Sequence, residues 1–396
     1  MIYSIFNKHH SNITSDRIVI RETRMIKLFN PSFCFALKKC SVLLVILLSS
    51  ILVSCGGSDD SRRHRPSGNQ TDPRKPLSWG HEQTIYVFAD DRVWYYAEQY
   101  LRESIERYYF TTENETYFDL KRGDFSSLDL FYRFKNLIFL AHLDSDRHVS
   151  NYIKQNLTEN VIQSVNENGV GMFIRHNLWA NDQLVLFLVG DTEANLLRYN
   201  ILQADEVFQQ FREKLYARTA SRIFGFNVHP VSLFRNFPWN MKIPEYYIVY
   251  KRNEADNFIS FLARRREQPD RYLSVYYEDM PENNLDIDWL FTTRERLAWQ
   301  YYDEDEFRRE DTRSEVTDLV GINALKLSGR WQNRKHAIGG AFQSFAFYDD
   351  IGKRAYLIDN SVFYPEGFKL PALIELEVIS RTIDLEQESE ALSAVE

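Results

Sequence analysis

The chain has 396 residues and a formal net charge of −8. An acidic surface of this kind repels phosphate backbones and anionic lipid headgroups, so nucleic acid is excluded as a partner and charge supplies no membrane affinity. The length suffices for one large domain or two modest ones.

The first 54 residues have the three parts of a bacterial secretion signal. The basic pair Lys38-Lys39 precedes an apolar run over residues 40–53, which is shorter than the roughly 20 residues of a membrane-spanning helix. The run ends in Leu52-Val53-Ser54-Cys55, which resembles a lipobox, so we expect cleavage before Cys55 and acylation of this residue with palmitate-type chains. The alternative is an ordinary cysteine behind a conventional signal peptide. Met25 is the expected true start, because a complete basic region follows it.

Removal of this leader would change the chemistry of the remaining chain. Cys34 and Cys40 would be lost and only Cys55 would remain, so we expect neither a disulfide nor a cysteine metal site. The leader carries seven basic and two acidic residues, a net of +5, and subtracting +5 from −8 leaves −13 for the rest. Two or three acyl chains, at about 0.8 kcal/mol per buried methylene, would make membrane attachment effectively permanent.

Residues 56–78 are rich in Gly, Ser, Asp, Arg and Pro and hold almost no large apolar side chain. This composition predicts a disordered tether with a reach of about 26 Å. Ser58-Asp59-Asp60 resembles the acidic export signals of surface lipoproteins in Bacteroidota. We therefore expect a lipid-anchored protein of the bacterial outer membrane, facing either the periplasm or the cell surface.

From residue 84 onward the pattern is that of a globular protein. Residues 84–89, 136–141 and 184–189 are short and almost wholly apolar, which is typical of central strands covered on both faces. Apolar residues at helical spacing over 93–108 and 194–215 predict helices that lie on this sheet. Gly169-Val170-Gly171 precedes another apolar strand, and its glycines favour a turn over a phosphate-binding loop.

The second half has strands of a different kind. Four segments are rich in tyrosine and phenylalanine and alternate in polarity, which predicts an antiparallel sheet with one wetter face. These segments are residues 245–250, 272–277, 341–348 and 355–362. We expect a helix over 285–301 and a closing helix with Pro371 in its first turn. The charged stretch 303–313 is interpreted as a solvated loop.

The predicted fold class is therefore α+β, with mixed or antiparallel sheets, helices packed on them, and two sequential lobes after the signal and tether. The predicted divisions are leader and signal 1–54, lipidated cysteine and tether 55–78, N-terminal α/β lobe 79–225, C-terminal α+β lobe 226–382 and acidic tail 383–396.

Six segments between residues 84 and 379 carry a resemblance. They are the strand after Lys135-Asn136, Trp179-Ala180-Asn181-Asp182-Gln183, Phe237-Pro238-Trp239, Arg330-Trp331, Gly339-Gly340-Ala341-Phe342 and residues 364–369. In these segments the chain resembles an uncharacterised family of Bacteroidota-type lipoproteins, known as a domain of unknown function. It departs from the family pattern at Ala341, where proline is expected, and in the final helix, which lacks the expected basic residues. The resemblance implies location and one coherent fold, and brings no activity with it.

The most site-like cluster in the sequence is residues 142–148. In an extended segment His142, Asp144, Asp146 and His148 would point to one face, and imidazole with carboxylate suits a divalent cation. The alternative is that the chain reaches the surface after a buried strand, where Asp144 or Asp146 caps the next helix. No other cofactor is expected.

Aromatic residues supply the candidate binding groups, which are Trp179, Arg330 and Trp331. Arg330-Trp331 precedes a double glycine and suits a stacked or ligand-facing pair, although a tryptophan at a strand start more often packs in a core. Five adjacent tyrosine pairs, such as Tyr95-Tyr96, predict a tyrosine-bearing surface for glycan or protein, and core filling is the alternative.

The sequence holds no Gly-x-Ser-x-Gly, Ser-x-x-Lys or His-Glu-x-x-His motif, so no catalytic residue is assigned. The leading hypothesis is a membrane-anchored envelope lipoprotein that serves as a binding or assembly module for an envelope protein or glycan. The alternative is a lipid-anchored hydrolase acting on envelope polymer or glycan. A deep pocket with converging titratable groups would favour the hydrolase, and a flat tyrosine-lined face would favour the binding module.

Overall fold

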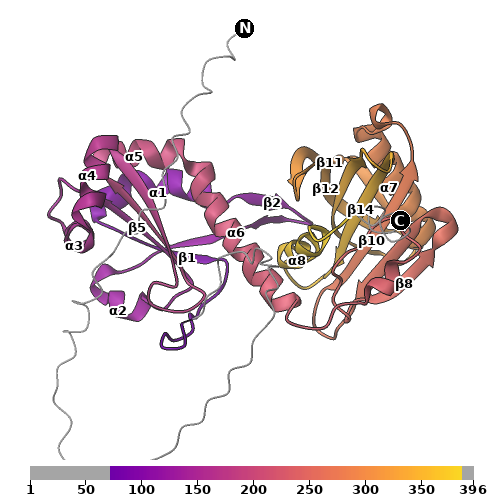
Figure 1. Cartoon of the computed structure of the whole chain (residues 1–396), viewed down its shortest axis with the longest axis horizontal. Coiled ribbons are helices and arrows are strands. Elements are labelled where there is room, and N and C mark those ends of the chain that lie inside the picture. Colours follow the sequence, from indigo (N-terminus) through magenta and orange to yellow (C-terminus); the bar gives the residue numbers. More distant parts are fainter. Residues whose placement is uncertain (1–71, 386–396) are drawn as a thin grey trace, which may run out of the picture.

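A computed structural model gives the structure of residues 72–385, which fold into two lobes (Figure 1). The predicted α+β class with two lobes is confirmed. The predicted signal, Cys55 and the tether up to residue 71 lie outside the described residues, as does the tail from residue 386. Between residues 72 and 385, no helix is long and apolar enough to cross a membrane.

The N-terminal lobe is built on a five-stranded sheet of order β4-β1-β5-β7-β6. Its strands are β1 (Thr84–Ala89), β4 (Asp119–Arg122), β5 (Asn136–His142), β6 (Val170–His176) and β7 (Leu184–Gly190). β4, β1, β5 and β7 are parallel, and β6 is antiparallel to β7. The three predicted central strands are confirmed as β1, β5 and β7, and every residue of β5 and β7 is buried.

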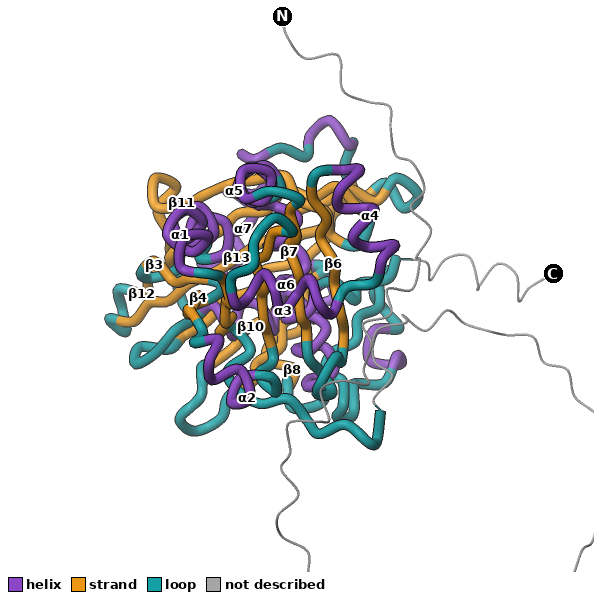
Figure 2. Tube along the Cα trace, turned by 90° about the vertical axis from the view of Figure 1, so that its left-hand side faces the viewer, coloured by secondary structure: helices purple, strands orange, loops and turns teal. Residues whose placement is uncertain are grey.

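Helices cover both faces of this sheet because successive strand residues point to opposite sides. The helices are α1 (Asp91–Ile105), α2 (Leu128–Phe131), α3 (His148–Asn156), α4 (Glu159–Asn168), α5 (Glu193–Leu202) and α6 (Ala204–Ile223). α1, α5 and α6 pack on one face, and α3 and α4 on the other. Figure 2 views this lobe end on. Both predicted helical segments are confirmed, with the second divided into α5 and α6, and Gly169 ends α4 in a left-handed turn as expected.

The C-terminal lobe is a seven-stranded antiparallel sheet of order β11-β12-β13-β14-β10-β9-β8. Its elements are β8 (Ile248–Asn253), β9 (Phe258–Ala263), β10 (Asp270–Asp279), α7 (Ile287–Tyr301), β11 (Glu306–Leu319), β12 (Ile322–Asn333), β13 (Ile338–Asp349), β14 (Arg354–Phe363) and α8 (Leu370–Ser380). α7 covers one face and α8 the other. The expected wetter face is therefore wrong for the central strands, and eight consecutive residues of β13 are buried.

The charged stretch predicted as a solvated loop is mostly a strand. Residues 306–313 belong to β11, which lies at the edge of the C-terminal sheet and pairs only with β12. An edge strand keeps most of its side chains in water, and charge on it discourages pairing with other chains. Because the residues of this segment are charged, the sequence pattern did not predict a strand here.

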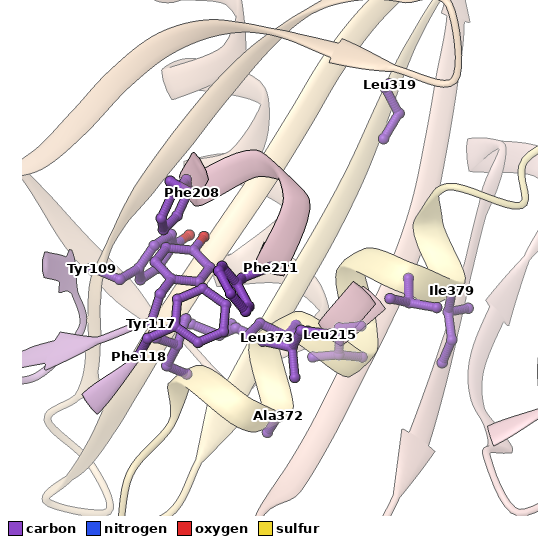
Figure 3. Packing of buried hydrophobic residues seen from close by; sticks show 14 of the residues in the cluster. Tyr109, Tyr117, Phe118, Phe208, Phe211, Leu215, Leu319, Ala372, Leu373 and Ile379 are labelled. Atoms are coloured by element: carbon purple, nitrogen blue, oxygen red, sulfur yellow. The ribbon is translucent and has the colours of Figure 1, made fainter. Parts of the chain in front are cut away.

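The two lobes share one hydrophobic core. The hairpin of β2 (Tyr108–Phe110) and β3 (Asn114–Thr116) leaves the N-terminal lobe, and the Tyr109 hydroxyl donates to Gln343 of β13 at 2.8 Å. Tyr109, Tyr117 and Phe118 pack with Phe208 of α6 and Leu373 of α8 (Figure 3).

A buried carboxylate also joins the lobes, and a buried ion pair lies next to this contact. Both carboxylate oxygens of Glu115 accept backbone N–H groups at the start of α8, from Lys369 and Leu370, at 2.8 Å each. Lys326 lies 3.4 Å from Glu377 of α8, with both side chains buried. Burial alone would raise the pKa of Glu377, but Lys326 lowers it below its ordinary value. Separating the lobes would leave Glu115 and these two N–H groups without partners, whereas Lys326 and Glu377 belong to the same lobe and would stay paired.

Candidate functional site

A hollow of about 1220 Å³ opens at the carboxyl edge of the N-terminal sheet. It is lined by residues 89–93 after β1, 122–126 after β4, 142 and 144–149 after β5, and 193 after β7. From β1 the chain passes to β4 on one side and then to β5 on the other, so the connections diverge between β1 and β5. Open α/β sheets bind ligands at this kind of topological switch point. We call this the switch-point hollow.

The floor of the hollow is set by Asp90, which follows β1. Its carboxylate accepts the backbone N–H groups of Val149 at 2.9 Å and Ser150 at 3.1 Å, and the Ser150 hydroxyl at 2.7 Å. Asp90 therefore satisfies the first turn of α3 from a different element. The expected capping of this helix by Asp144 or Asp146 is wrong, because a residue distant in sequence holds that position.

The predicted metal cluster lines the hollow, but its geometry differs from the prediction. β5 ends at His142 and α3 begins at His148, with a turn between them, so the four residues do not share an extended face. Nδ1 of His142 contacts the Asp144 carboxylate, while Asp146 pairs with Lys154 at 2.7 Å and has its pKa lowered by that contact. Across residues 72–385 no group of three or more His, Cys, Asp or Glu side chains is placed to hold a metal ion. Metal binding here stays a prediction.

The rim of the hollow combines paired and unpaired charges. Arg92 pairs with Glu193 at 3.0 Å, and Arg122 contacts Asp91 and lowers its pKa. The first turn of α1 receives no side-chain cap, so its N–H groups add positive potential at the same edge. Arg147 lies on this rim, is exposed, and makes no ion pair with any residue the structure describes. The hollow can therefore accept a polar ligand with a negatively charged group.

Exposed aromatic side chains flank this site. A second hollow of about 580 Å³ shares Arg92 and His142 with the first and adds Tyr96 and Leu197. Tyr95 and Tyr96 are both exposed, by 77% and 49%, which places one predicted tyrosine pair on the surface of α1. Other predicted tyrosines fill the core instead: Tyr109, Tyr247 and Tyr276 are buried.

The structure does not bring the three predicted binding residues together. Trp179 packs on Phe139 in the N-terminal lobe, with ring centroids 6.1 Å apart. Arg330 of β12 pairs with Asp311 at 3.0 Å, whereas Trp331 points to the opposite face of the sheet and is buried in the cluster beneath α7. Their binding role stays a prediction.

The segment around Trp179 connects α6 to neighbouring loops at the amino edge of the N-terminal sheet. The Asp182 carboxylate lies 2.9 Å from Lys214 and 3.1 Å from Arg218 of α6. Burial would raise the pKa of Asp182, but these two cations lower it. Side chains of Asn181 and Gln183 bond to the backbone of neighbouring loops. These bonds account for the polar residues of this segment without a ligand.

The sequence singled out Trp331 but missed the smaller hollow that this residue lines in the C-terminal lobe. About 240 Å³ in volume, it lies where α7 ends over β10, β12 and β14, and Arg294, Asp305 and Asp359 line it. One local signal was present: Arg294 sits among Leu290, Leu297 and Ala298 in the apolar stripe of α7. We call this the C-terminal pocket.

The comparisons with known proteins match each lobe to a family model. Residues 78–224 match DUF8532 and residues 228–382 match DUF4837, each described as a domain of unknown function. The expectation that the chain falls within domains of unknown function is thereby confirmed. The search of curated proteins found no match.

Solved structures give weak likenesses. A Bacteroides thetaiotaomicron protein is 9% identical with a TM-score of 0.23, over 40% of this chain and 47% of that chain, so this chain spans about half its length. The Saccharomyces cerevisiae Ran-binding protein Mog1p is 9% identical with a TM-score of 0.28, over 39% and 94%. LpqN, involved in cell envelope biogenesis of Mycobacterium tuberculosis, is 10% identical with a TM-score of 0.23, over 37% and 81%. Likenesses this weak carry no functional argument.

Proposed function

Because the chain carries one domain of unknown function in each lobe, we propose its role from its own features. It is a lipid-anchored envelope protein that serves as a binding module, and its N-terminal lobe takes a small polar ligand in the switch-point hollow. The observation that carries this proposal is the position of a 1220 Å³ hollow, lined by charged side chains, between the diverging connections of β1 and β5.

Six carboxylates line the hollow, and each is engaged by a cation, an N–H group or an imidazole. The ligand carries a negatively charged group, because three other features at this edge favour one. The uncapped first turn of α1 directs N–H groups to the rim, Arg147 is exposed without an ion pair in the described chain, and His148 lies beside it. A carboxylate or phosphate group on the ligand would accept hydrogen bonds from these N–H groups and pair with Arg147.

A thermal-shift experiment tests the ligand. A panel of small carboxylates and phosphate esters is added to the full chain, and one that binds the native state raises its melting temperature. Arg147→Glu should abolish the shift, whereas Arg266→Glu, at an exposed site in the C-terminal lobe, should preserve it. Equal shifts in wild type and Arg147→Glu would refute the proposed site.

The proposed envelope role depends on membrane attachment, which a separate experiment tests. Acylation of Cys55 anchors the protein, and the tether carries the lobes to their partner, an envelope protein or glycan. Wild-type protein should fractionate with outer membranes, and Cys55→Ala should become soluble. Protease added to intact cells then distinguishes the surface from the periplasm. Identical fractionation of both proteins would overturn the anchor.

One observation favours the hydrolase as a second candidate. The His142 ring lines the hollow and its Nδ1 contacts Asp144, and an imidazole oriented by a carboxylate is a general-base arrangement. Release of soluble fragments from purified cell-wall polymer by wild type, lost in His142→Asn, would establish this function in place of simple binding.

A further inference from the structure

We propose that the C-terminal pocket is a second binding site, which takes one neutral saccharide unit. It lies in the other lobe from the switch-point hollow, and its chemistry differs. Aromatic rings and charged side chains line it. The inference does not depend on the proposed function of the N-terminal lobe.

The aromatic wall is formed by rings from three elements. Tyr250 of β8, Tyr272 of β10 and Tyr302 after α7 lie with ring centroids 5.7 to 6.3 Å apart. Trp331 and Phe363 form a second group, with centroids 6.4 Å apart. Aromatic faces of this kind offer apolar area to the C–H face of a sugar ring, and their polar tips remain available for hydrogen bonds.

A fixed ion pair forms part of the floor. Nε of Arg294 donates to Asp359 at 2.8 Å and to the Ser344 hydroxyl at 3.1 Å, and both charged side chains are over nine-tenths buried. The guanidinium carbon lies 3.4 Å from the ring centroid of Phe342, which holds the group in place. The ion pair is rigid, and Nε of Arg294 already has its hydrogen-bond acceptors.

Two donors beside the pocket cannot reach a ligand in it. The indole N–H of Trp331, a side chain only 7% exposed, and Nη1 of Arg294 make no hydrogen bond within residues 72–385, and both nitrogens are closed to solvent. Gly340 packs against the indole nitrogen. A ligand must therefore find its hydrogen-bond partners among the other polar groups of the pocket.

Asp305 is a hydrogen-bond acceptor in the pocket that can still accept from a ligand. Its carboxylate receives one hydrogen bond from Asn333 at 2.8 Å and has no ion-pair partner among the described residues. The other lining carboxylates are engaged: Asp270 pairs with Arg264, and Asp303 with Lys335. Burial raises the pKa of Asp305 to about 6, which is typical of a carboxyl group at a functional site.

These features select a neutral polyol over other ligands. Four carboxylates and two guanidinium groups line the pocket, so an anion would be repelled. A cation would pair with Asp305 but would also be repelled by the guanidinium groups of Arg264 and Arg294, which line the same pocket. Sugar hydroxyls donate hydrogen bonds without carrying charge, so one ring can bind Asp305 while it lies on the tyrosines. The volume of about 240 Å³ limits the ligand to a small unit.

Calorimetric titration of the full chain, in a detergent without sugar groups, tests the proposal. The probes are glucose, galactose, mannose and N-acetylglucosamine, with choline chloride as the cationic comparison. We expect at least one sugar to bind and choline not to bind. Asp305→Asn should weaken sugar binding at least tenfold, since a charge-assisted hydrogen bond is lost. Tyr250→Ala, which removes one ring of the aromatic wall, should also weaken it.

The matched control is Asp350→Asn, in the exposed turn between β13 and β14. It should change the affinity for sugar less than twofold, and Arg147→Glu in the other lobe should do the same. Failure of all four sugars to bind, binding of choline in their place, or equal affinity in Asp305→Asn would each overturn the proposal. Thermal unfolding of each variant establishes that it is folded.

Discussion

Replacement of Asp305 by asparagine should make the protein more stable at neutral pH. Burial raises the pKa of this carboxyl group from 3.8 to about 6. The folded pKa lies above the unfolded one, so the contribution of Asp305 to stability is fully present below about pH 4 and is lost as the pH rises through about 6. Asparagine keeps the shape and never ionises, and it removes the cost of a half-buried charge.

The magnitude follows from the shift. At about 1.36 kcal/mol per pKa unit, a shift of this size corresponds to about 3 kcal/mol at most. Asp305 is only partly buried and solvent screens its charge, which reduces the expected gain to about 1–2 kcal/mol. The gain should therefore be about 1–2 kcal/mol near pH 7.5 and close to zero near pH 4.

Urea unfolding of wild type and Asp305→Asn at several pH values measures this difference. The gain in free energy of unfolding should increase with pH, and Asp350→Asn, in an exposed turn, is the matched control. A variant that is less stable than wild type near pH 7.5, or a gain independent of pH, would refute the reasoning. Higher stability together with lost sugar binding would identify Asp305 as a residue retained for function at a cost in stability.

Three further substitutions each remove a buried polar contact, and urea unfolding measures the resulting loss in free energy of unfolding. Glu115→Gln leaves one buried N–H of α8 without an acceptor and should cost about 1–3 kcal/mol, and an unchanged midpoint would contradict this. Lys326→Met should cost about 2–3 kcal/mol, below the usual cost of breaking a buried pair, because Arg381 still lies 3.0 Å from Glu377. Asp90→Ala should cost about 1–2 kcal/mol by exposing the first turn of α3, and a cost under a few tenths would exclude its capping role.

The sequence was sufficient to predict those strands whose burial determines their amino-acid composition. β1, β5 and β7 are almost wholly apolar because helices cover both faces of their sheet, and this composition is visible in any one of them. The same reasoning failed for β11, whose charged residues are those of an exposed edge. Pattern reports how deeply a segment is buried, and an edge strand resembles a loop in that respect.

Sites were harder to predict than strands because their members come from distant segments. The sequence singled out residues 142–148, which line the hollow, but the shape of that segment depends on Asp90, more than fifty residues earlier, which binds the start of α3. In the C-terminal pocket, Arg294 meets Asp359 across 65 positions and no spacing rule connects them. The available hint was an arginine in an apolar helix stripe, a local inconsistency of the kind that marks functional sites.

The contact between the lobes also depends on directional groups. Apolar side chains such as Tyr117, Phe208 and Leu373 supply buried area, but that area alone tolerates sliding and rotation. Glu115 admits much less freedom, since its two oxygens must each meet a backbone N–H of α8 at 2.8 Å. The orientation of the C-terminal sheet relative to the N-terminal one is therefore fixed by a carboxylate on a short hairpin. Because each hollow lies within one lobe, a change there should alter the angle between the lobes and leave the lining of both hollows intact.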